Sequence, residues 1–334
     1  MTIVPDFDLT PYTTFHVPAR ASWFAEYGTV DELLSILSDS RFRGMPFLHI
    51  GGGSNLLFTK PFEGLVLHSA MRGMSTRNDI SPTESILEAE SGLNWDEFVR
   101  RSIDEGLYGL ENLAYIPGEV GASAIQNIGA YGVEAKDFIH SVSTIDTATG
   151  NERVFTPEEC RYAYRDSIFK HVAGRYIVTK AAYRLSRVKK FTLEYGPLKE
   201  LASDPGLTAS KVYDRVVNIR RSKLPEPSEL GSAGSFFKNP VVPVDKFNRL
   251  KSEYADIPSY EAPAGIKIPA GWLIEHAGLK GHRIGGAEVY PKQCLVIVNT
   301  GSATARDIVD LYTFIQRTVE RIYGIRLEPE ANIV

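Results

Sequence analysis

The spacing of apolar positions and the placement of capping residues together predict helices at four places in the chain. In segments 210–223 and 304–324, apolar residues recur three or four positions apart and therefore line one face of a helix. The segments 30–39 and 95–105 are predicted helices because a threonine and an asparagine, both suited to N-capping, stand directly before them. Acidic residues in the first turn of the segment 30–39 favour the same start.

Short apolar runs predict strands between these helices. The runs are "WFAEY" (23–27), "PFLHI" (46–50), "GLVLH" (64–68), "SVSTIDT" (141–147), "ERVFT" (152–156), "RYIVTKAAYRL" (175–185) and "CLVIVN" (294–299). Helices and strands alternate, so the predicted fold class is α+β, with α/β units and mixed sheets. A chain of 334 residues exceeds what one core usually serves. We expect three units, 1–72, 73–224 and 225–324, with the last strand, 325–334, joining the second.

Composition narrows the function class. The formal net charge is −4 with no block of basic residues, which argues against a nucleic-acid partner. Two cysteines, Cys160 and Cys294, form no CxxC motif, so neither a disulfide framework nor a metal site is expected. The N-terminal segment lacks a leader pattern, and no apolar run reaches about 18 residues. We therefore expect a cytoplasmic protein without a membrane partner.

Two glycine-rich segments indicate a ligand that carries phosphates. "GGGSN" (51–55) follows a strand and can present backbone N–H groups, although a tight turn explains it equally well. It lacks the doubly wound fingerprint, because Leu56 stands where the third glycine is required. Residues 106–132 hold six glycines and almost no charge, which is unusual for a plain connection. Together the segments favour a flavin or nicotinamide dinucleotide bound by another fold.

Several residues could do chemistry, each with an ordinary alternative. Ser235 in "GSAGSFFKNP" (231–240) lies outside a nucleophile elbow, and its hydroxyl could close a turn or donate a proton. Four small residues are not expected to begin a core strand. Arg165 could pair with the adjacent Asp166 or grip a substrate carboxylate. Lys223 ends a helix and could complement its dipole or bind a diphosphate.

Seven blocks in order carry a resemblance to a known family. The blocks are "GGGSN", "ENLAYIPGEVGASAIQNIGAYG", "YRDSIFK", "RRSKLP", "GSAGSFFKNP", "PAGWLIEHAGLKG" and "LEPE". Over roughly residues 10–331 the chain resembles the UDP-N-acetylenolpyruvoylglucosamine reductases of bacterial peptidoglycan synthesis. Tyr195 in "LEYGPL", with the double phenylalanine, resembles the enterobacterial type that has an inserted loop.

The resemblance implies a fold and a cofactor. The fold would be the FAD-binding type of vanillyl-alcohol oxidase, two subdomains clasping a non-covalent FAD, followed by a C-terminal α+β substrate-binding domain. NADPH would be the co-substrate. Residues expected to bind FAD are Gly51, Gly52, Gly53, Ser54, Asn55, Ile116, Gly121, Ala122, Ser123, Ile125, Asn127, Gly129, Ala130 and Tyr131.

The resemblance also implies a mechanism for reducing UDP-N-acetylglucosamine enolpyruvate to UDP-N-acetylmuramate. Hydride passes from NADPH to the flavin and then to the outer carbon of the enol-ether bond. Arg165 would hold the substrate carboxylate, and Ser235 would protonate the inner carbon. Glu330, beside the developing negative charge, should be protonated with a raised pKa. The expected substrate contacts are Tyr164, Tyr195, Lys223, Asn239 and Gln293.

Two other functions fit parts of this pattern. A different FAD-dependent oxidoreductase of the same fold, acting on a sugar or lactone, would not need Arg165, Ser235 and Glu330 together. A nucleotide-sugar sensor would not need Ser235 or Glu330. Asn332 stands where some relatives carry an arginine near the flavin, which bears on FAD affinity. We expect a monomer in the bacterial cytoplasm.

Overall fold

The computed structural model describes every residue of the chain except Asp79, and the chain divides into two compact units. Unit 1 comprises Met1–Phe7, Ala21–Gly52 and Phe62–Arg221. Unit 2 comprises Asp8–Arg20, Gly53–Pro61 and Ser222–Val334. Each unit has a hydrophobic core of its own.

The first sheet of unit 1 has the strand order β1-β2-β5-β3. Its strands and the helix that follows β2 are β1 (Thr2–Asp8), β2 (Arg20–Tyr27), β5 (Phe62–Ser69), β3 (Phe47–Ile50) and α1 (Val30–Ser38). β5 pairs in parallel with both β2 and β3. The Thr29 hydroxyl accepts the Glu32 N–H at 3.2 Å, so the predicted cap of α1 is confirmed.

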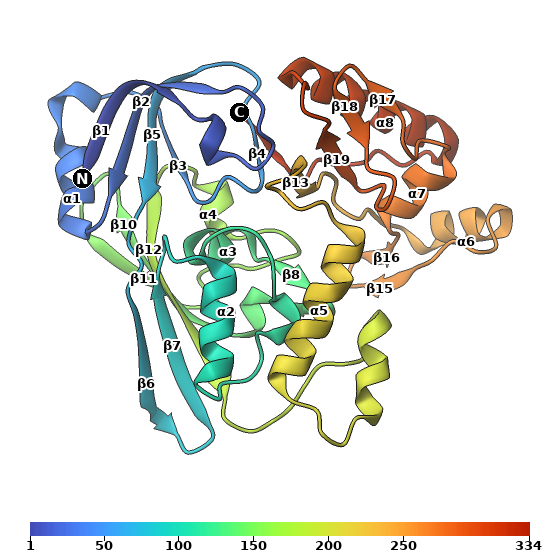
Figure 1. Ribbon diagram of the computed structural model, residues 1–334, viewed down its shortest axis with the longest axis horizontal. Helices are drawn as coiled ribbons and strands as arrows, with labels where there is room; N and C mark the ends of the chain where they lie inside the picture. The colour runs from blue at the N-terminus through green and yellow to red at the C-terminus, as the bar shows by residue number, and fades with distance from the viewer. The chain divides into compact units, whose positions relative to one another are not determined.

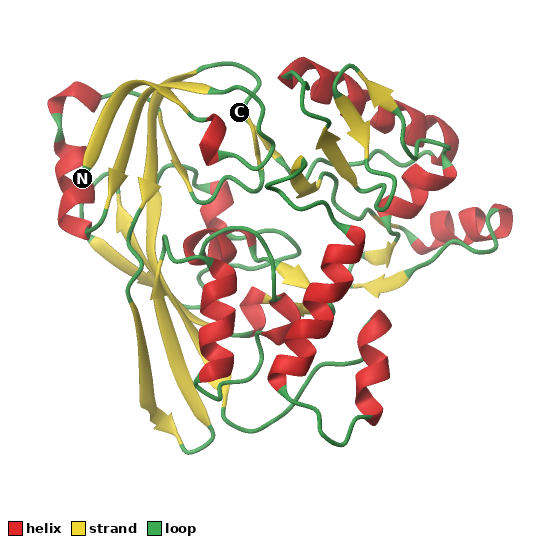
Figure 2. Cartoon of the chain, in the orientation of Figure 1, coloured by secondary structure: helices red, strands yellow, loops and turns green.

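The second sheet of unit 1 is antiparallel (Figures 1 and 2). In spatial order its strands are β11 (Glu152–Phe155), β10 (Ile139–Asp146), β12 (Tyr176–Ser186), β7 (Glu84–Glu90) and β6 (Met74–Ser81). The helices of this part are α2 (Trp95–Asp104), α3 (Val120–Gln126), α4 (Ile168–His171) and α5 (Ala209–Lys223), with a small pair β8 (Gly129–Ala130) and β9 (Val133–Glu134). Helix α3 packs on β12 and β7, and α2 packs against α3.

A cluster of buried aromatic side chains joins the helices of unit 1 to this sheet. Trp95 and Phe98 of α2 meet Tyr183 of β12, with ring centroids 5.0–5.6 Å apart. All three side chains are fully buried. The Trp95 indole N–H donates to the Leu113 carbonyl at 2.8 Å, which fixes the start of the glycine-rich tract against α2. Burial of rings of this size makes the cluster a main source of stability for unit 1.

Unit 2 combines small sheets with three helices. Its strands are β13 (Gly231–Ser235), β19 (Val296–Asn299), β18 (Ala287–Val289) and β17 (Arg283–Ile284) in one sheet, β14 (Val241–Val242), β16 (Gly265–Lys267) and β15 (Tyr260–Ala262) in a second, and β20 (Asn332–Ile333) with β4 (Leu56–Leu57) in a third. The helices are α6 (Val244–Glu253), α7 (Ala270–His276) and α8 (Ala305–Tyr323). A capping box of Thr304 and Asp307 begins α8, and Gly324 at φ +62 ends it.

The observed elements confirm the predicted α+β class, and one local expectation was wrong. The small residues 231–235 form β13, which pairs with β19 in the sheet. Close packing explains why a strand is built this way. A Cβ on Gly231 would lie 2.3 Å from the Phe15 carbonyl oxygen, so a larger residue would push the strand off its neighbour.

We predict that Gly53→Ala destabilises unit 2 far more than Gly278→Ala. Both glycines have positive φ, +61 and +75, but only at Gly53 would a Cβ strike main chain, 1.9 Å from the Tyr12 oxygen. Gly278→Ala should cost about 1 kcal/mol from left-handed strain alone. Gly53→Ala should cost at least about 3 kcal/mol. Urea unfolding of both variants measures this, and equal losses would show that contact with Tyr12 is not what requires glycine.

Candidate functional site

The triglycine after β3 is a bare stretch of main chain. A Cβ on Gly51 would lie 3.2 Å from both the Ala122 Cβ and a carboxylate oxygen of Glu119, the residue that precedes α3. A Cβ on Gly52 would lie 3.5 Å from the Cα of Gly118. A side chain at Gly51 would therefore be crowded by the start of α3, whereas a Cβ at Gly52 would make only an ordinary van der Waals contact. Both the turn interpretation and the phosphate-binding interpretation remain compatible with this geometry, because glycines offer a ligand only their main chain.

The end of the same loop is tied to the C-terminal segment within unit 2. The Asn55 side chain donates to the Glu330 carbonyl at 3.1 Å. The Asn55 carbonyl in turn accepts the Asn332 backbone N–H at 3.0 Å and its side-chain amide at 3.3 Å. Asn332, the departure noted in the sequence, thus holds the loop that precedes β4.

The expected cofactor residues in the second glycine-rich tract divide into two groups. Gly121, Ser123 and Asn127 are buried. The Ser123 hydroxyl bonds to Tyr183, and the Asn127 amide donates to Glu134 and to the Ala163 carbonyl. These side chains shape the tract from within. The part-exposed members are Ile116, Ala122, Ile125, Gly129, Ala130 and Tyr131.

Arg165 is held by the carbonyls of this tract. Its two terminal nitrogens donate to Gly129 at 2.7 Å and to Asn127 at 3.4 Å. Its backbone is left-handed, with φ +55, and its carbonyl accepts from Lys170 at 3.0 Å. Asp166, the ion-pair partner considered from the sequence, bonds instead to His171 at 2.8 Å. Carbonyl oxygens are neutral acceptors, so these two hydrogen bonds orient the guanidinium without neutralising its charge.

Two tyrosines expected at the substrate, Tyr164 and Tyr195, each contact a candidate residue of unit 1. The guanidinium carbon of Arg165 lies 5.4 Å from the Tyr164 ring centroid. Tyr195, 42% exposed, meets the ring of Tyr131 edge to face at 6.1 Å. The Tyr131 carbonyl accepts from the Asn112 side chain at 2.8 Å. The inserted loop thus contacts the tract through this aromatic pair and through the Asn112 side chain, which also donates to the Thr192 carbonyl at 2.8 Å.

In unit 2 the main chain brings Ser235 and Glu330 onto adjoining segments. Ser235 is the last residue of β13, and the next carbonyl, that of Phe236, accepts the Glu330 N–H at 2.7 Å. Phe237 bridges Pro329 in the same antiparallel arrangement. Phe236 and Phe237 are fully buried, which anchors the segment and leaves Ser235 part-exposed. The double phenylalanine therefore positions the serine.

Two further predicted contacts meet at the start of α7. The Asn239 side chain accepts the Ala270 N–H at 2.9 Å. A Cβ on Gly271 would lie 2.8 Å from the side-chain oxygen of Gln293, so this glycine admits the glutamine. Lys223, at the end of α5, is exposed. The structure thus gathers Ser235, Asn239, Gln293 and Glu330 on connected segments of unit 2, and Arg165 with the tyrosines in unit 1.

Comparison with known proteins decides the family. Residues 226–334 match a model described as the C-terminal domain of UDP-N-acetylenolpyruvoylglucosamine reductase, and residues 21–156 match one described as an FAD binding domain. The UDP-N-acetylenolpyruvoylglucosamine reductase of Bacteroides fragilis is 44% identical over 331 residues, which cover 98% of this chain and 99% of the relative. The chain belongs to this reductase family.

Other members agree over nearly their full length. The UDP-N-acetylenolpyruvoylglucosamine reductases of Pseudomonas putida and Porphyromonas gingivalis are each 43% identical, covering 97% and 100% of this chain and 97% and 100% of their own. The crystal structure of the Thermus caldophilus reductase matches with a TM-score of 0.68 at 25% identity, covering 99% of this chain and 98% of that one. The predicted family and its reductase activity are confirmed.

The FAD-binding assignment agrees with the local geometry. The matched FAD binding domain contains both glycine-rich segments. The glycine main chain of residues 51–53 and the part-exposed residues of the second tract provide N–H groups and apolar surface of the kind that a dinucleotide requires. Within residues 1–78 and 80–334, no His, Cys, Asp and Glu residues cluster as metal ligands. In that same part of the reductase, no helix has the length and apolarity to span a membrane.

Sequence reasoning gave no role to Glu111, a buried acid in the second tract. Its side chain is 2% exposed, and one oxygen accepts the Gly109 N–H at 2.9 Å. The other oxygen has no hydrogen-bond partner among the described residues. Burial raises the pKa of Glu111 to about 7, against the opposing effect of backbone hydrogen bonds. No sequence signal marks this acid, because its burial depends on tertiary packing.

We predict that Glu111 makes the reductase less stable as the pH rises from about 4.5 to 7. Over this range the folded chain keeps a proton that the unfolded chain loses, so raising the pH favours unfolding, by up to about 3 kcal/mol. Glu111→Gln removes the titration and should gain stability relative to the native protein toward pH 8. Melting temperatures of both proteins between pH 5 and 8 measure the difference. A difference independent of pH would mean that Glu111 is already ionised when folded.

Proposed function

We propose that this reductase is an NADPH-dependent flavoenzyme that converts UDP-N-acetylglucosamine enolpyruvate to UDP-N-acetylmuramate for peptidoglycan synthesis. The observation that carries the proposal is 43–44% identity to named UDP-N-acetylenolpyruvoylglucosamine reductases over nearly the whole chain. Within this proposal the FAD-binding subdomains are residues 1–72 and 73–224, the second joined by the strand 325–334, and the substrate-binding domain is residues 225–324. The FAD binding domain match at 21–156 lies within the first two of these ranges. We also place the protein in the cytoplasm as a monomer.

The candidate residues would hold two ligands, FAD and the substrate. The main chain of Gly51–Asn55 would bind the FAD diphosphate, and the part-exposed residues from Ile116 to Tyr131 would line the rest of the cofactor. FAD, when bound, supplies hydride transfer from NADPH to the enol-ether double bond. Tyr164 and Tyr195 would contact the substrate from unit 1. Lys223 and Asn239 would bind the diphosphate of the substrate, with Gln293 beside them.

Three side chains would lie next to the negative charge that forms when hydride is added to the substrate. When the outer carbon of the double bond gains the hydride, negative charge forms on the inner carbon and spreads into the carboxylate. Arg165 would bind that carboxylate, because its guanidinium is positively charged and is held in place by the carbonyls of Asn127 and Gly129. Glu330 would lie beside the same carbon. The Ser235 Oγ–H would give its proton to the inner carbon and complete the reduction.

An anaerobic spectrum of the FAD-loaded protein tests the function directly. We predict that NADPH bleaches the flavin absorbance and that UDP-N-acetylglucosamine enolpyruvate then restores it. Recovery only with oxygen would mean that the flavoenzyme acts on a different substrate, such as another sugar or a lactone. A protein that fails to bind added FAD would contradict the proposal at its first step.

We predict that Ser235→Ala separates the two halves of the reaction. Flavin reduction by NADPH should stay within a few-fold of the native rate, whereas reoxidation by the substrate should slow roughly a hundredfold to ten-thousandfold. Ser232→Ala is the matched control, because Ser232 lies in the same strand, is buried, and has its backbone paired with Thr14. Stopped-flow absorbance resolves both steps. Equal slowing of both steps would make Ser235 a structural residue.

A further inference from the structure

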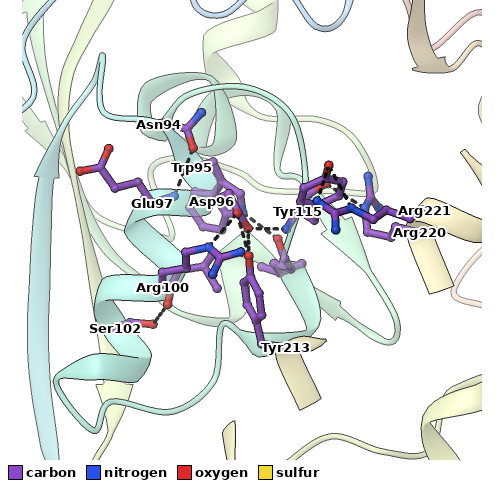
Figure 3. A network of polar contacts seen from close by, with 12 residues as sticks. Asn94, Trp95, Asp96, Glu97, Arg100, Ser102, Tyr115, Tyr213, Arg220 and Arg221 are labelled. Atoms are coloured by element: carbon purple, nitrogen blue, oxygen red, sulfur yellow. Dashed lines mark hydrogen bonds and ion pairs between the residues drawn. The ribbon is translucent and has the colours of Figure 1, made fainter. Parts of the chain in front are cut away.

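Asp96 is the centre of a polar network in unit 1 that the proposed reaction leaves unused. It is the second residue of α2, and its carboxylate accepts the Tyr115 backbone N–H at 2.7 Å. It also accepts the Tyr213 hydroxyl of α5 at 2.7 Å and the Arg100 side chain at 3.3 Å (Figure 3). One carboxylate therefore joins α2, α5 and the segment that leads to Ile116.

Tyr115 is strained and is gripped from its other side as well. Its φ is +58, a conformation that an aromatic residue adopts only when the surroundings impose it. Its carbonyl accepts the Nε–H of Arg220 at 2.9 Å, and its hydroxyl accepts from Arg221 at 3.3 Å. In Figure 3 the Tyr115 side chain lies between Asp96 and the two arginines. The strain at Tyr115 is thus maintained by an acid on one side and a partly buried cation on the other.

The Arg220 guanidinium has N–H groups that bond to no described residue. Apart from the Nε bond to the Tyr115 carbonyl, its guanidinium forms no hydrogen bond and no ion pair with residues 1–78 or 80–334. It is partly buried. Burial lowers the pKa of Arg220, the Tyr131 hydroxyl opposes this, and the positive charge of Arg165 adds to it. Two guanidinium groups that share a neighbourhood, one of them with unused N–H donors, form a site that favours an anion.

We propose that Arg220 is a further binding residue that donates its terminal N–H groups to an anionic oxygen of a bound ligand, and that Asp96 is the residue that positions it through Tyr115. The identity of the ligand rests on the proposed function. The oxygen belongs to the substrate carboxylate or to FAD, both of which a planar guanidinium can bind with two parallel hydrogen bonds. Asp96 acts at a distance, by holding the carbonyl that orients Arg220.

Binding measurements on Arg220→Gln test the first part. Flavin fluorescence gives the Kd for FAD, and the change in flavin absorbance gives the Kd for UDP-N-acetylglucosamine enolpyruvate. The variant should lose roughly tenfold to a hundredfold in affinity for one of the two ligands. A loss for the substrate assigns the oxygen to its carboxylate, and a loss for FAD assigns it to the cofactor. The matched control is Arg100→Gln, an arginine of the same network that is 58% exposed, with losses under about threefold.

Two more variants keep the proposal open to refutation if Arg220→Gln does not fold. Arg220→Lys preserves the charge but not the fork, and should still lose roughly tenfold for the same ligand. Asp96→Asn keeps the size of the side chain while removing its charge, and should weaken that ligand alone by roughly threefold to tenfold. The proposal is overturned if the folded Arg220 variants bind every ligand within about threefold of the native protein, or if Arg100→Gln loses as much.

The native protein separates this inference from the proposed function. If it does not oxidise NADPH with the enolpyruvyl substrate, the proposed function fails. The affinity for FAD then decides on Arg220 by itself, since an unchanged Kd in both Arg220 variants would reject the inference.

Discussion

Left-handed backbone at residues with large side chains is the constraint on which the site in unit 1 depends. The residues with positive φ within the span 115–165, glycines aside, are Tyr115, Asn127, Tyr131, Arg161 and Arg165. Each such residue costs on the order of 1 kcal/mol, so each needs partners that impose the conformation. Asp96 and Arg220 hold Tyr115, Glu134 and Ala163 hold Asn127, and carbonyls of the tract hold Arg165. The polar network therefore maintains the shape that the candidate site needs.

In unit 2, main-chain hydrogen bonds hold the candidate residues in position. Ser235 and Glu330 are brought to adjoining segments by the hydrogen bond between the Glu330 N–H and the Phe236 carbonyl and by the bridge from Phe237 to Pro329. These bonds do not involve the side chains of Ser235 or Glu330. The buried rings of Phe236 and Phe237, the two residues that follow the serine, anchor this end of the strand. A change at the serine can therefore remove chemistry while leaving the backbone in place, which makes its substitution informative.

The elements with strong local signals were predictable from the sequence, and those that rely on distant contacts were not. The helices at 30–38, 95–104, 209–223 and 305–323 follow from caps and apolar spacing, as do most strands of the antiparallel sheet. The strand of small residues at 231–235 was missed, because its need for glycine comes from Phe15, more than 200 positions away. The short helix 120–126 was hidden in a glycine-rich tract for a similar reason, since Gly121 packs on Ser91.

The candidate residues of the site came from the resemblance to the family. The structure then shows which of their side chains are buried and which are partly exposed. Ser123 and Asn127 face inward to Tyr183 and Glu134, a distinction that spacing alone cannot make. Arg220 lies in the block "RRSKLP", but the sequence predicted a role only for Lys223. Any cation is favourable near the end of a helix, so position along the helix does not distinguish the two residues. What distinguishes Arg220 is the environment: a strained tyrosine carbonyl takes one donor and leaves the others unused. Such a property exists only after folding.

In unit 1, two arginines and two acids of the candidate site have partners of different kinds. Arg165 donates to carbonyl oxygens, and Arg220 donates to another, so neither positive charge is cancelled by the acceptor it bonds. The acids of the same tract are treated in the opposite way. Burial raises the pKa of Glu111 to about 7, and Glu119 lies 3.1 Å from His68, whose pKa is raised by this contact and by Glu26 against the effect of burial. The carbonyl acceptors of these two guanidinium groups are thus neutral, whereas the two acids either hold a raised pKa or contact a histidine. Partly burying the cations costs desolvation free energy, and the phosphate and carboxylate groups of the ligands proposed above would offset part of that cost.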